Sequence, residues 1–243
     1  MTAGQNENED ENEAWRNLDM TNHSGEPHAK AVIFDMDGVL VLSEPLLTEA
    51  SIRLFADRGF SVTREEFKPF TGMGEARFMG GVAERHGIPF DPVADKERLY
   101  EVFLEMMPGR LKPLPGVPGF IRECKRQGFK VALASSADDV KVYPILKHIG
   151  IDPEEFDAIV TGSAVARKKP APDVFLEAVR RLGVPASSCL VAEDALAGVE
   201  ASIAAGCRTL GLTTSFAAEV LRAAGADWTA PDLASVPPEA LAW

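Results

Sequence analysis

The sequence predicts an α/β fold: a doubly wound parallel sheet that carries an inserted α-helical domain. The first observation is a set of five short runs, apolar on both faces as buried parallel strands are. They span residues 31–34, 129–134, 158–160, 190–192 and 209–212. The second observation is that helical segments separate these runs. The third is the stretch between the first two runs, residues 36–128, which is far longer than a simple crossover between parallel strands.

Five helical segments accompany the strands, and a glycine closes each of them. The segments span residues 117–127, 138–148, 172–182, 195–205 and 216–224, and the glycines are Gly128, Gly150, Gly183, Gly206 and Gly225. Glycine is the preferred residue just past the end of a helix. Alternating strands and helices of this kind predict the doubly wound core.

The long stretch after the first strand has helical periodicity of its own, over 45–58, 64–69, 75–86 and 93–107. We therefore assign residues 45–112 to a helical cap, and residues 29–44 and 113–243 to the α/β core. An insertion at this point is placed to cover the carboxyl ends of the strands, where open α/β sheets bind ligands.

The composition indicates a folded, acidic protein. Hydrophobic residues make up 46% of the 243 residues, which is enough for a sizeable core. The formal net charge is −12, whereas binding to nucleic-acid phosphates needs clustered Lys and Arg. We therefore expect no nucleic-acid partner.

Half of the net charge lies in an N-terminal tail, residues 1–28. Seven acidic residues and one basic residue give the tail a charge of −6. It is rich in Asn and Glu and poor in apolar residues, so we expect it to be disordered. Its charge and lack of an apolar segment fit neither a secretory signal nor an organellar transit peptide.

The apolar runs and the cysteines indicate a cytoplasmic protein. No run approaches the roughly 18–20 apolar residues needed to cross a bilayer, so we expect no membrane partner. Cys124, Cys189 and Cys207 are odd in number and show no metal-binding spacing. Each lies in an apolar or helical stretch, and a reducing cytosol is the simplest compartment for them.

Four polar clusters follow four of the apolar runs: Asp35 and Asp37, Ser135 and Ser136, Lys168 and Lys169, and Glu193 and Asp194. A parallel sheet brings all four to one edge. Carboxylates packed so closely repel one another and are neutralised most simply by a hard divalent cation with oxygen ligands. Because Mg²⁺ binds through a few carboxylates plus substrate phosphate, the pattern predicts a site for Mg²⁺ and a phosphoryl group, which the lysine and hydroxyls face.

Each cluster also has a purely structural alternative. Asp and Gly are common in turns after strands, and Ser135 or Ser136 could cap the helix that follows. Glu193 and Asp194 could equally cap the next helix, and Lys169 could be a solvated loop lysine. The functional interpretation is favoured by the joint order of the clusters, each behind a strand.

The four clusters resemble the motifs of the haloacid dehalogenase (HAD) superfamily. FDMDGVL (34–40), VALASS (131–136), KKPAPDVF (168–175) and VAEDALAGVEA (191–201) are similar to its first to fourth motifs. The resemblance covers about residues 29–230. The insertion after the first motif is similar to the C1 helical cap of the β-phosphoglucomutase-like subgroup.

The resemblance implies a role for each motif residue. Asp35 is then the nucleophile, which forms an aspartyl-phosphate. Asp37 is the general acid for the leaving alcohol and then the base for the attacking water. Ser135 and the amide of Ser136 bind phosphoryl oxygens, and Lys169 neutralises the nucleophile and the phosphate.

The resemblance also implies Mg²⁺ as the cofactor. Its ligands are expected to be the Asp35 carboxylate, the Asp37 backbone carbonyl and Asp194. Glu193 is expected either to ligate the metal or to bind a metal-bound water. Dehalogenases of the superfamily use no metal and lack an aspartate at the position of Asp37, which disfavours carbon–halogen hydrolysis here.

Three cap residues are candidates for substrate contact: Gly72, Glu75 and Arg77. The β-phosphoglucomutases carry a histidine where this chain has Leu47, and an arginine for the distal phosphate of the substrate where it has Glu75. Arg77 lies two residues further on. A carboxylate repels a phosphate dianion, so a hexose-phosphate mutase is disfavoured. A hinge or helix-end role for Gly72 stays equally open.

The cap stretch EEFKPFTGMGEARFMGGVA (65–83) resembles the HAD domain of plant chloroplast proteins that also carry thioredoxin-like and NHL-repeat modules. Together the resemblances imply a monomeric, Mg²⁺-dependent phosphatase that hydrolyses a small phosphomonoester, a sugar phosphate or a similar metabolite, through an aspartyl-phosphate. The alternatives are a phosphomutase of the β-phosphoglucomutase type and a non-catalytic regulatory module that binds phosphate and metal.

Overall fold

The computed structural model describes residues 29–243 and contains one six-stranded sheet. All neighbouring strands are parallel, and their order is β3-β2-β1-β4-β5-β6. The first strand, β1, therefore lies in the middle of the sheet. The next two strands, β2 and β3, follow on one side of it, and β4, β5 and β6 follow on the other side. The point at which the direction changes lies between β1 and β4, which is where such sheets bind ligands.

The strands are β1 Ala31–Phe34, β2 Lys130–Ala134, β3 Ala158–Val160, β4 Cys189–Glu193, β5 Arg208–Leu212 and β6 Trp228–Ala230. The helices are α3 Glu44–Asp57, α4 Glu75–His86, α5 Ala94–Met106, α6 Val117–Arg126, α7 Asp139–His148, α8 Asp173–Leu182, α9 Leu196–Ala204 and α10 Ala218–Ala223. Short 3₁₀ helices are η2 Arg64–Phe70, η3 Pro153–Glu155, η4 Gly162–Ala164, η5 Ala186–Ser188, η6 Leu233–Ser235 and η7 Pro238–Ala240.

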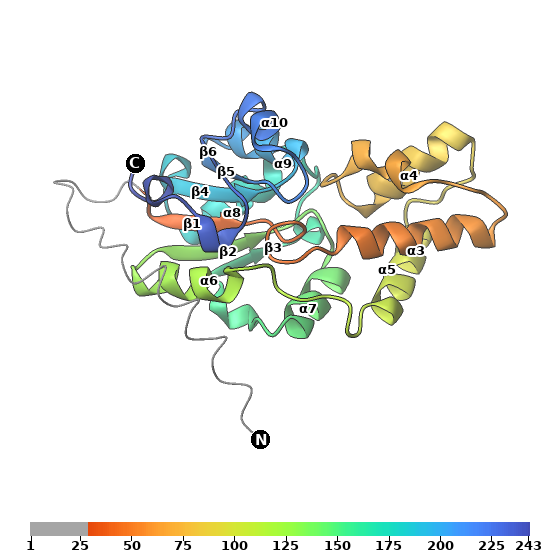
Figure 1. Cartoon of the computed structure of the whole chain (residues 1–243), viewed down its shortest axis with the longest axis horizontal. Helices are drawn as coiled ribbons and strands as arrows, with labels where there is room; N and C mark the ends of the chain where they lie inside the picture. The colour runs from red at the N-terminus through yellow and green to blue at the C-terminus, as the bar shows by residue number, and fades with distance from the viewer. Residues whose placement is uncertain (1–28) are drawn as a thin grey trace, which may run out of the picture.

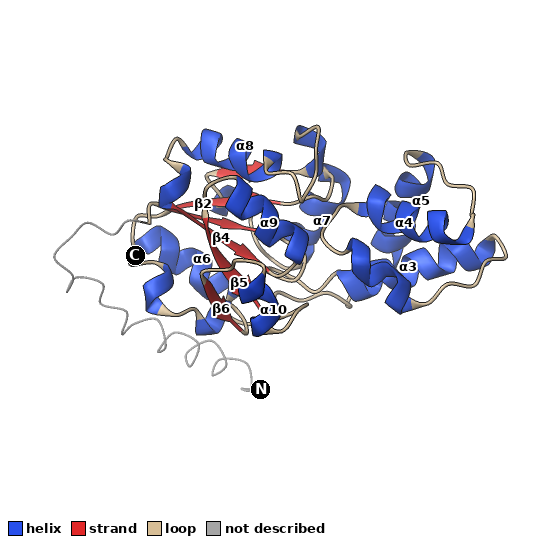
Figure 2. Cartoon of the chain, turned by 90° about the horizontal axis from the view of Figure 1, so that it is seen from above, coloured by secondary structure: helices blue, strands red, loops and turns tan. Residues whose placement is uncertain are grey.

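Side chains of β1 alternate between two apolar layers, one on each face of the sheet. Val32 and Phe34 join the layer that contains residues of α6 and α7, whereas Ala31 and Ile33 join the layer that contains residues of α8 and α9. Because β1 is covered on both faces, its uninterrupted apolar sequence is what a central parallel strand requires. Figures 1 and 2 show the helices on both sides of the sheet.

Helices α3, α4 and α5 gather beyond one end of the sheet, separate from the helices that flank it (Figure 1). Their packing centres on aromatic rings: Phe67 lies 6.3 Å from Phe55 and 4.8 Å from Phe78 between ring centroids. The same apolar cluster runs on into the core through Leu40 and Val41. The division of the chain into a core and a cap stays a prediction.

The predicted fold class is confirmed, with one strand more than the sequence indicated. β6 is only three residues long, and two of its three residues are half-buried, so it carries no strong apolar pattern. The three cysteines are free thiols and are buried. In the part of the chain described here, no helix is long and apolar enough to cross a bilayer. The expectation for the tail, residues 1–28, lies outside the described residues.

Replacing Phe67 with alanine should destabilise the chain by about 3–5 kcal/mol, because it empties a buried site between two rings. Urea unfolding followed by circular dichroism measures this change. Leu176→Ala is the control, since Leu176 is 44% exposed on α8 and its loss should change the free energy of unfolding by less than about 0.5 kcal/mol. Equal effects of the two substitutions would contradict the packing described for the cap.

Candidate active site

The carboxyl ends of β1 and β4 place three acidic side chains together at the change of direction in the sheet. Asp35 follows β1, Glu193 ends β4 and Asp194 follows it. Ligand oxygens of the three lie within 4.8 Å of one another, and all three residues are buried. The local cause is the parallel register, which pairs Phe34 with Ala192 and so brings the next residues of both strands to one edge.

Lys169 supplies a buried positive charge to this cluster. Its ammonium donates hydrogen bonds to Asp35 Oδ1 and, over 2.8 Å, to Glu193 Oε1. It also lies 4.7 Å from the centroid of the Phe175 ring. Burial alone disfavours the ammonium, but the two carboxylates outweigh it and raise the pKa of Lys169 above its usual value.

Glu193 is held by the backbone as well as by Lys169. Its Oε2 accepts hydrogen bonds from the amides of Asp194, at 2.6 Å, and Ala195, at 3.1 Å. Gly198 makes room for the carboxylate, since a Cβ there would lie 1.5 Å from Glu193 Oε1. Both carboxylate oxygens of Glu193 are therefore occupied by the protein itself.

Asp194 is fixed by hydroxyls from the loop after β5. Its Oδ2 accepts hydrogen bonds from Ser215 Oγ and, over 3.4 Å, from Thr214 Oγ1. Thr214 also donates to the carbonyl of Gly38 at 2.6 Å. A Cβ at Gly38 would lie 1.8 Å from Asp194 Oδ2, and its φ is +80°. Glycine is therefore required at this point of the loop after β1.

Burial favours the protonated form of two carboxyl groups in this cluster. It raises the pKa of Asp35 to about 7, against the opposing effect of Lys169. Burial also raises the pKa of Asp194, and the neighbouring charges of Glu193 and Asp35 raise it further. A divalent cation would stabilise the ionised forms. The donor set, carboxylate oxygens in a buried cluster, is the set that Mg²⁺ takes.

Ser135 and Ser136 follow β2 and line the pocket beside Asp35. Ser135 Oγ accepts a hydrogen bond from the amide of Ala137 at 3.1 Å, which leaves its own proton for another acceptor. Ser136 Oγ is buried and has no hydrogen-bond partner within residues 29–243. A buried hydroxyl normally has a partner, so this donor suits a ligand oxygen.

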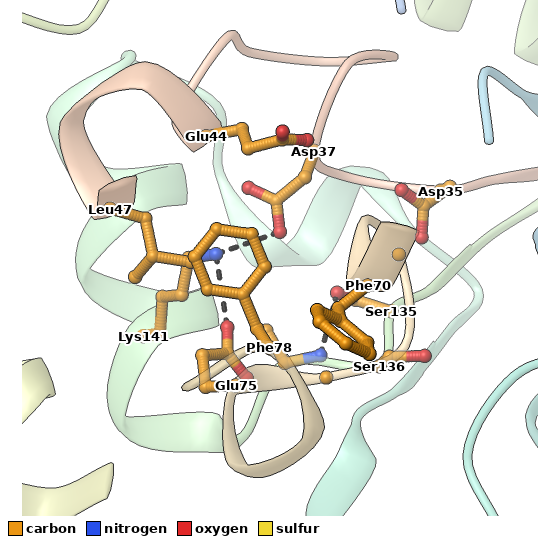
Figure 3. Close-up of a pocket in the computed structure, with 13 residues that line it drawn as sticks. Asp35, Asp37, Glu44, Leu47, Phe70, Glu75, Phe78, Ser135, Ser136 and Lys141 are labelled. Carbon is orange, nitrogen blue, oxygen red and sulfur yellow. Dashed lines mark hydrogen bonds and ion pairs between the residues drawn. The ribbon is translucent and has the colours of Figure 1, made fainter. Parts of the chain in front are cut away.

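Asp37 points away from the three-carboxylate cluster, toward α7 and the cap (Figure 3). Its Oδ1 accepts from Ser43 Oγ, and its Oδ2 accepts from Lys141 Nζ at 2.8 Å. Its side chain retains 25% exposure to the pocket. The two aspartates of the first motif therefore face different surroundings, one among carboxylates and one beside a lysine.

The pocket joins the sheet edge to the cap. Core residues Asp35, Asp37, Ser135 and Ser136 line one side, and the cap contributes Leu47, Phe70, Gly72, Gly74, Glu75 and Phe78. The sequence expectation that the cap covers the strand ends is in keeping with this lining. The predicted core residues are all close to the pocket or to its three-carboxylate cluster.

The three candidate cap residues differ in position. Gly72 and Glu75 line the pocket, and a Cβ at Gly72 would lie 2.9 Å from the Cβ of Ala195, so this glycine lets the cap approach the core. Glu75 is only 3% exposed. Arg77 instead lies at the surface, where its guanidinium pairs with Glu84 at 3.2 Å. The structure does not bring Arg77 together with the other candidates.

Sequence reasoning missed Lys141, Glu44 and the hydroxyls of Ser43, Thr214 and Ser215. Glu44 lines the pocket, and burial raises its pKa. None of these residues belongs to a recognisable motif, and Lys141 stands within a helix, where a lysine is usually solvated. A signal was present only in Lys141, whose neighbours along α7, Val142, Ile145 and Leu146, are all buried.

A family model for haloacid dehalogenase-like hydrolases matches residues 29–206. The protein SUPPRESSOR OF QUENCHING 1, chloroplastic, from Arabidopsis thaliana is 46% identical over 212 residues, which are 85% of this chain and 20% of that protein. A phosphorylated carbohydrates phosphatase from Thermotoga maritima is 35% identical over 186 residues, 73% of this chain and 82% of that protein.

A solved structure of CbbY from Rhodobacter sphaeroides in complex with phosphate superposes with a TM-score of 0.75. It is 31% identical and covers 85% of this chain and 95% of its own. This chain spans about a fifth of the Arabidopsis relative and most of the two bacterial ones. The expected superfamily and the similarity to a plant chloroplast protein are confirmed.

The metal-free protein should lose stability as the pH rises from about 4 toward 7. In that range the unfolded chain has released the proton of Asp35 (pKa 3.8), whereas the folded chain retains it until about pH 7. The stabilising contribution is complete below pH 3.8 and is gone above pH 7. Asp35→Asn, which carries no such proton, should lack this contribution.

Urea unfolding in EDTA between pH 5 and pH 8 measures the effect as the difference between the two proteins. The free energy of unfolding of the wild-type chain should fall relative to that of Asp35→Asn as the pH rises. Parallel curves would show that burial does not raise the pKa of Asp35.

Proposed function

Because this chain belongs to the haloacid dehalogenase-like hydrolase family, we propose that it is a Mg²⁺-dependent phosphatase. Its substrate is a small phosphomonoester, a sugar phosphate or a similar metabolite, hydrolysed through an aspartyl-phosphate. The observation that carries the proposal is the pairing of buried Asp35 with Lys169 at the switch point of the sheet, beside a buried hydroxyl without a partner on Ser136.

Asp35 is the nucleophile in this proposal. A carboxylate oxygen of Asp35 attacks phosphorus, the bond from phosphorus to the leaving oxygen breaks, and the phosphoryl group stays on Asp35. Lys169, bonded to Asp35 Oδ1, orients the carboxylate and offsets the charge of the incoming phosphoryl group. The hydroxyls of Ser135 and Ser136 donate hydrogen bonds to the phosphoryl oxygens.

Asp37 is the general acid and base. It gives its proton to the leaving oxygen in the first step. In the second step it takes a proton from water, whose oxygen attacks phosphorus while the bond from phosphorus to Asp35 breaks, and phosphate departs. The position of Asp37 supports this role, since Asp37 lines the same pocket as Asp35. Its carboxylate accepts hydrogen bonds from Ser43 and Lys141 and lies apart from the carboxylate cluster. The leaving group then lies under Leu47, Phe70 and Phe78 of the cap.

Asp35 and Asp194 would hold Mg²⁺, together with the Asp37 carbonyl. The ion, when bound, neutralises the carboxylates and the developing charge on the phosphoryl group. Glu193 has both oxygens engaged by Lys169 and backbone amides, which favours the arrangement in which it meets the metal through a bound water. A phosphatase relative and a relative solved with phosphate support the proposal; a cytoplasmic location and a monomeric state stay predictions.

The wild-type chain should release phosphate from some members of a panel of sugar phosphates in the presence of Mg²⁺, and release should stop in EDTA. Asp35→Asn should lower turnover at least about 10³-fold, as loss of a nucleophile does. Colorimetric detection of phosphate measures both. Asp57→Asn is the matched control, since Asp57 is exposed at the end of α3.

Phosphate release that persists in EDTA would contradict the metal requirement. Turnover by a folded Asp35→Asn protein would contradict the assigned nucleophile. Silence of the wild-type chain across the panel would favour the mutase or the non-catalytic module, and adding a sugar bisphosphate separates those two, since only a mutase would then interconvert isomers.

A further inference from the structure

Lys141 is a buried cation at the junction of core and cap that the proposed chemistry does not use. It stands on α7 of the core, and its side chain is 1% exposed. Its ammonium donates to Asp37 Oδ2 at 2.8 Å and to Glu75 Oε1 at 3.1 Å. Asp37 belongs to the core and Glu75 opens α4 of the cap, so one ammonium joins the two parts of the pocket (Figure 3).

The contacts continue from Glu75 back to the core. Glu75 Oε2 accepts a hydrogen bond from Tyr100 Oη at 2.8 Å, and Tyr100 Oη accepts one from the amide of Asp138 at 3.2 Å. Tyr100 lies on α5 of the cap, whereas Asp138 directly precedes α7. The carboxylate of Glu75 is therefore held at Oε2 from within the cap and at Oε1 by Lys141, and this second contact needs the cap to lie against the core.

The cap also surrounds the lysine itself. The Lys141 ammonium lies 5.5 Å from the centroid of the Phe103 ring on α5, a distance at which a cation is attracted to the ring face. Burial alone disfavours the ammonium, but the carboxylates of Asp37 and Glu75 raise the pKa of Lys141 above its usual value. Lys141 thus remains charged in the closed arrangement.

Stability alone does not explain this arrangement. Replacing a buried ion pair by apolar side chains is often neutral or stabilising, so the charges need another reason. The carboxylate of Asp37 would otherwise be fixed at one oxygen only, by Ser43. With Lys141 on the other oxygen, the plane of the Asp37 carboxylate is fixed within the pocket.

We propose that Lys141 and Glu75 are positioning residues: closure of the cap brings Glu75 onto Lys141, and Lys141 then fixes the carboxyl group of Asp37 at the leaving oxygen. The inference rests on the proposed function, because it assigns a partner to the general acid of that reaction. The step served is the first one, in which the proton of Asp37 moves to the leaving oxygen as the phosphorus–oxygen bond breaks.

The leaving group of the substrate separates a positioning role from a structural one. A sugar alkoxide is a poor leaving group and needs the proton of Asp37, whereas 4-nitrophenolate leaves without protonation. Lys141→Met should lower kcat/KM for an alkyl phosphate by about 10–100-fold, part of what a general acid contributes, and kcat/KM for 4-nitrophenyl phosphate by less than about threefold. This quantity excludes the second step, in which Asp37 serves both substrates as the base. The ratio of the two kcat/KM values is the measurement.

Two control variants isolate the contact with Asp37. Lys147→Met changes an exposed lysine on the same helix and should leave both rates unchanged. Lys96→Met removes an ion pair between α5 and Asp138 that links cap and core without touching Asp37. Each molecule that closes still has Glu75 on Lys141 and Lys141 on Asp37, so the rates with both substrates should change by the same factor.

The double variant Lys141→Met with Glu75→Gln guards against a folding defect. It removes both charges while keeping an acceptor for Tyr100, so its thermal stability should exceed that of Lys141→Met. Its ratio of alkyl to aryl turnover should stay as low as in the single variant. Recovery of the ratio together with stability would show that Lys141 is only structural.

Equal losses with both substrates in Lys141→Met would overturn the inference and leave the proposed phosphatase intact. A wild-type chain that hydrolyses neither compound would overturn the proposed function, and the inference with it. The two failures are therefore distinguishable.

Discussion

The neutralisation of buried carboxylates by Lys169 is the interaction on which the site depends. The switch point of the sheet forces Asp35, Glu193 and Asp194 into one buried cluster, and charges of one sign in such a place are costly without a partner. Lys169 meets two of the three, and the hydroxyls of Thr214 and Ser215 meet the third. In the proposed function, this cluster is the place that takes the cation and the phosphoryl group.

The sequence predicted what depends on local pattern. Short apolar runs between helices were enough for the parallel sheet, because a strand buried on both faces has no polar alternation. The edge of the sheet then followed from the position of each polar cluster behind its strand, and Asp35 and Lys169 meet as that argument requires. The short edge strand Trp228–Ala230 was missed because two of its three residues are only half-buried and carry no such pattern.

Contacts between distant elements could not be predicted in the same way. The Lys141 side chain meets Glu75 across 66 positions and Asp37 across 104. Its apolar neighbours along α7 are a local signal for burial, but nothing in the sequence identifies these distant partners. The sequence marked Glu75 as a departure from a phosphate-binding arginine and as a candidate for substrate contact; both stay predictions, and Glu75 lines the pocket. In the structure the Glu75 carboxylate accepts hydrogen bonds from Lys141 and Tyr100. The Lys141 ammonium, which could otherwise have met a second phosphate, is therefore already paired.

Each of the two aspartates of the first motif pairs with a buried lysine that also pairs with a glutamate. Asp35 shares Lys169 with Glu193, and Asp37 shares Lys141 with Glu75. In the first case all three groups stand at strand ends or loops of the core, so the arrangement does not depend on the cap. In the second, the glutamate belongs to the cap, so the contact between Lys141 and Glu75 exists only when the cap lies against the core. In the proposed mechanism, the nucleophile is thus oriented at all times and the acid on closure of the cap. This division suits a two-step transfer in which the proton is needed only once a substrate fills the closed pocket.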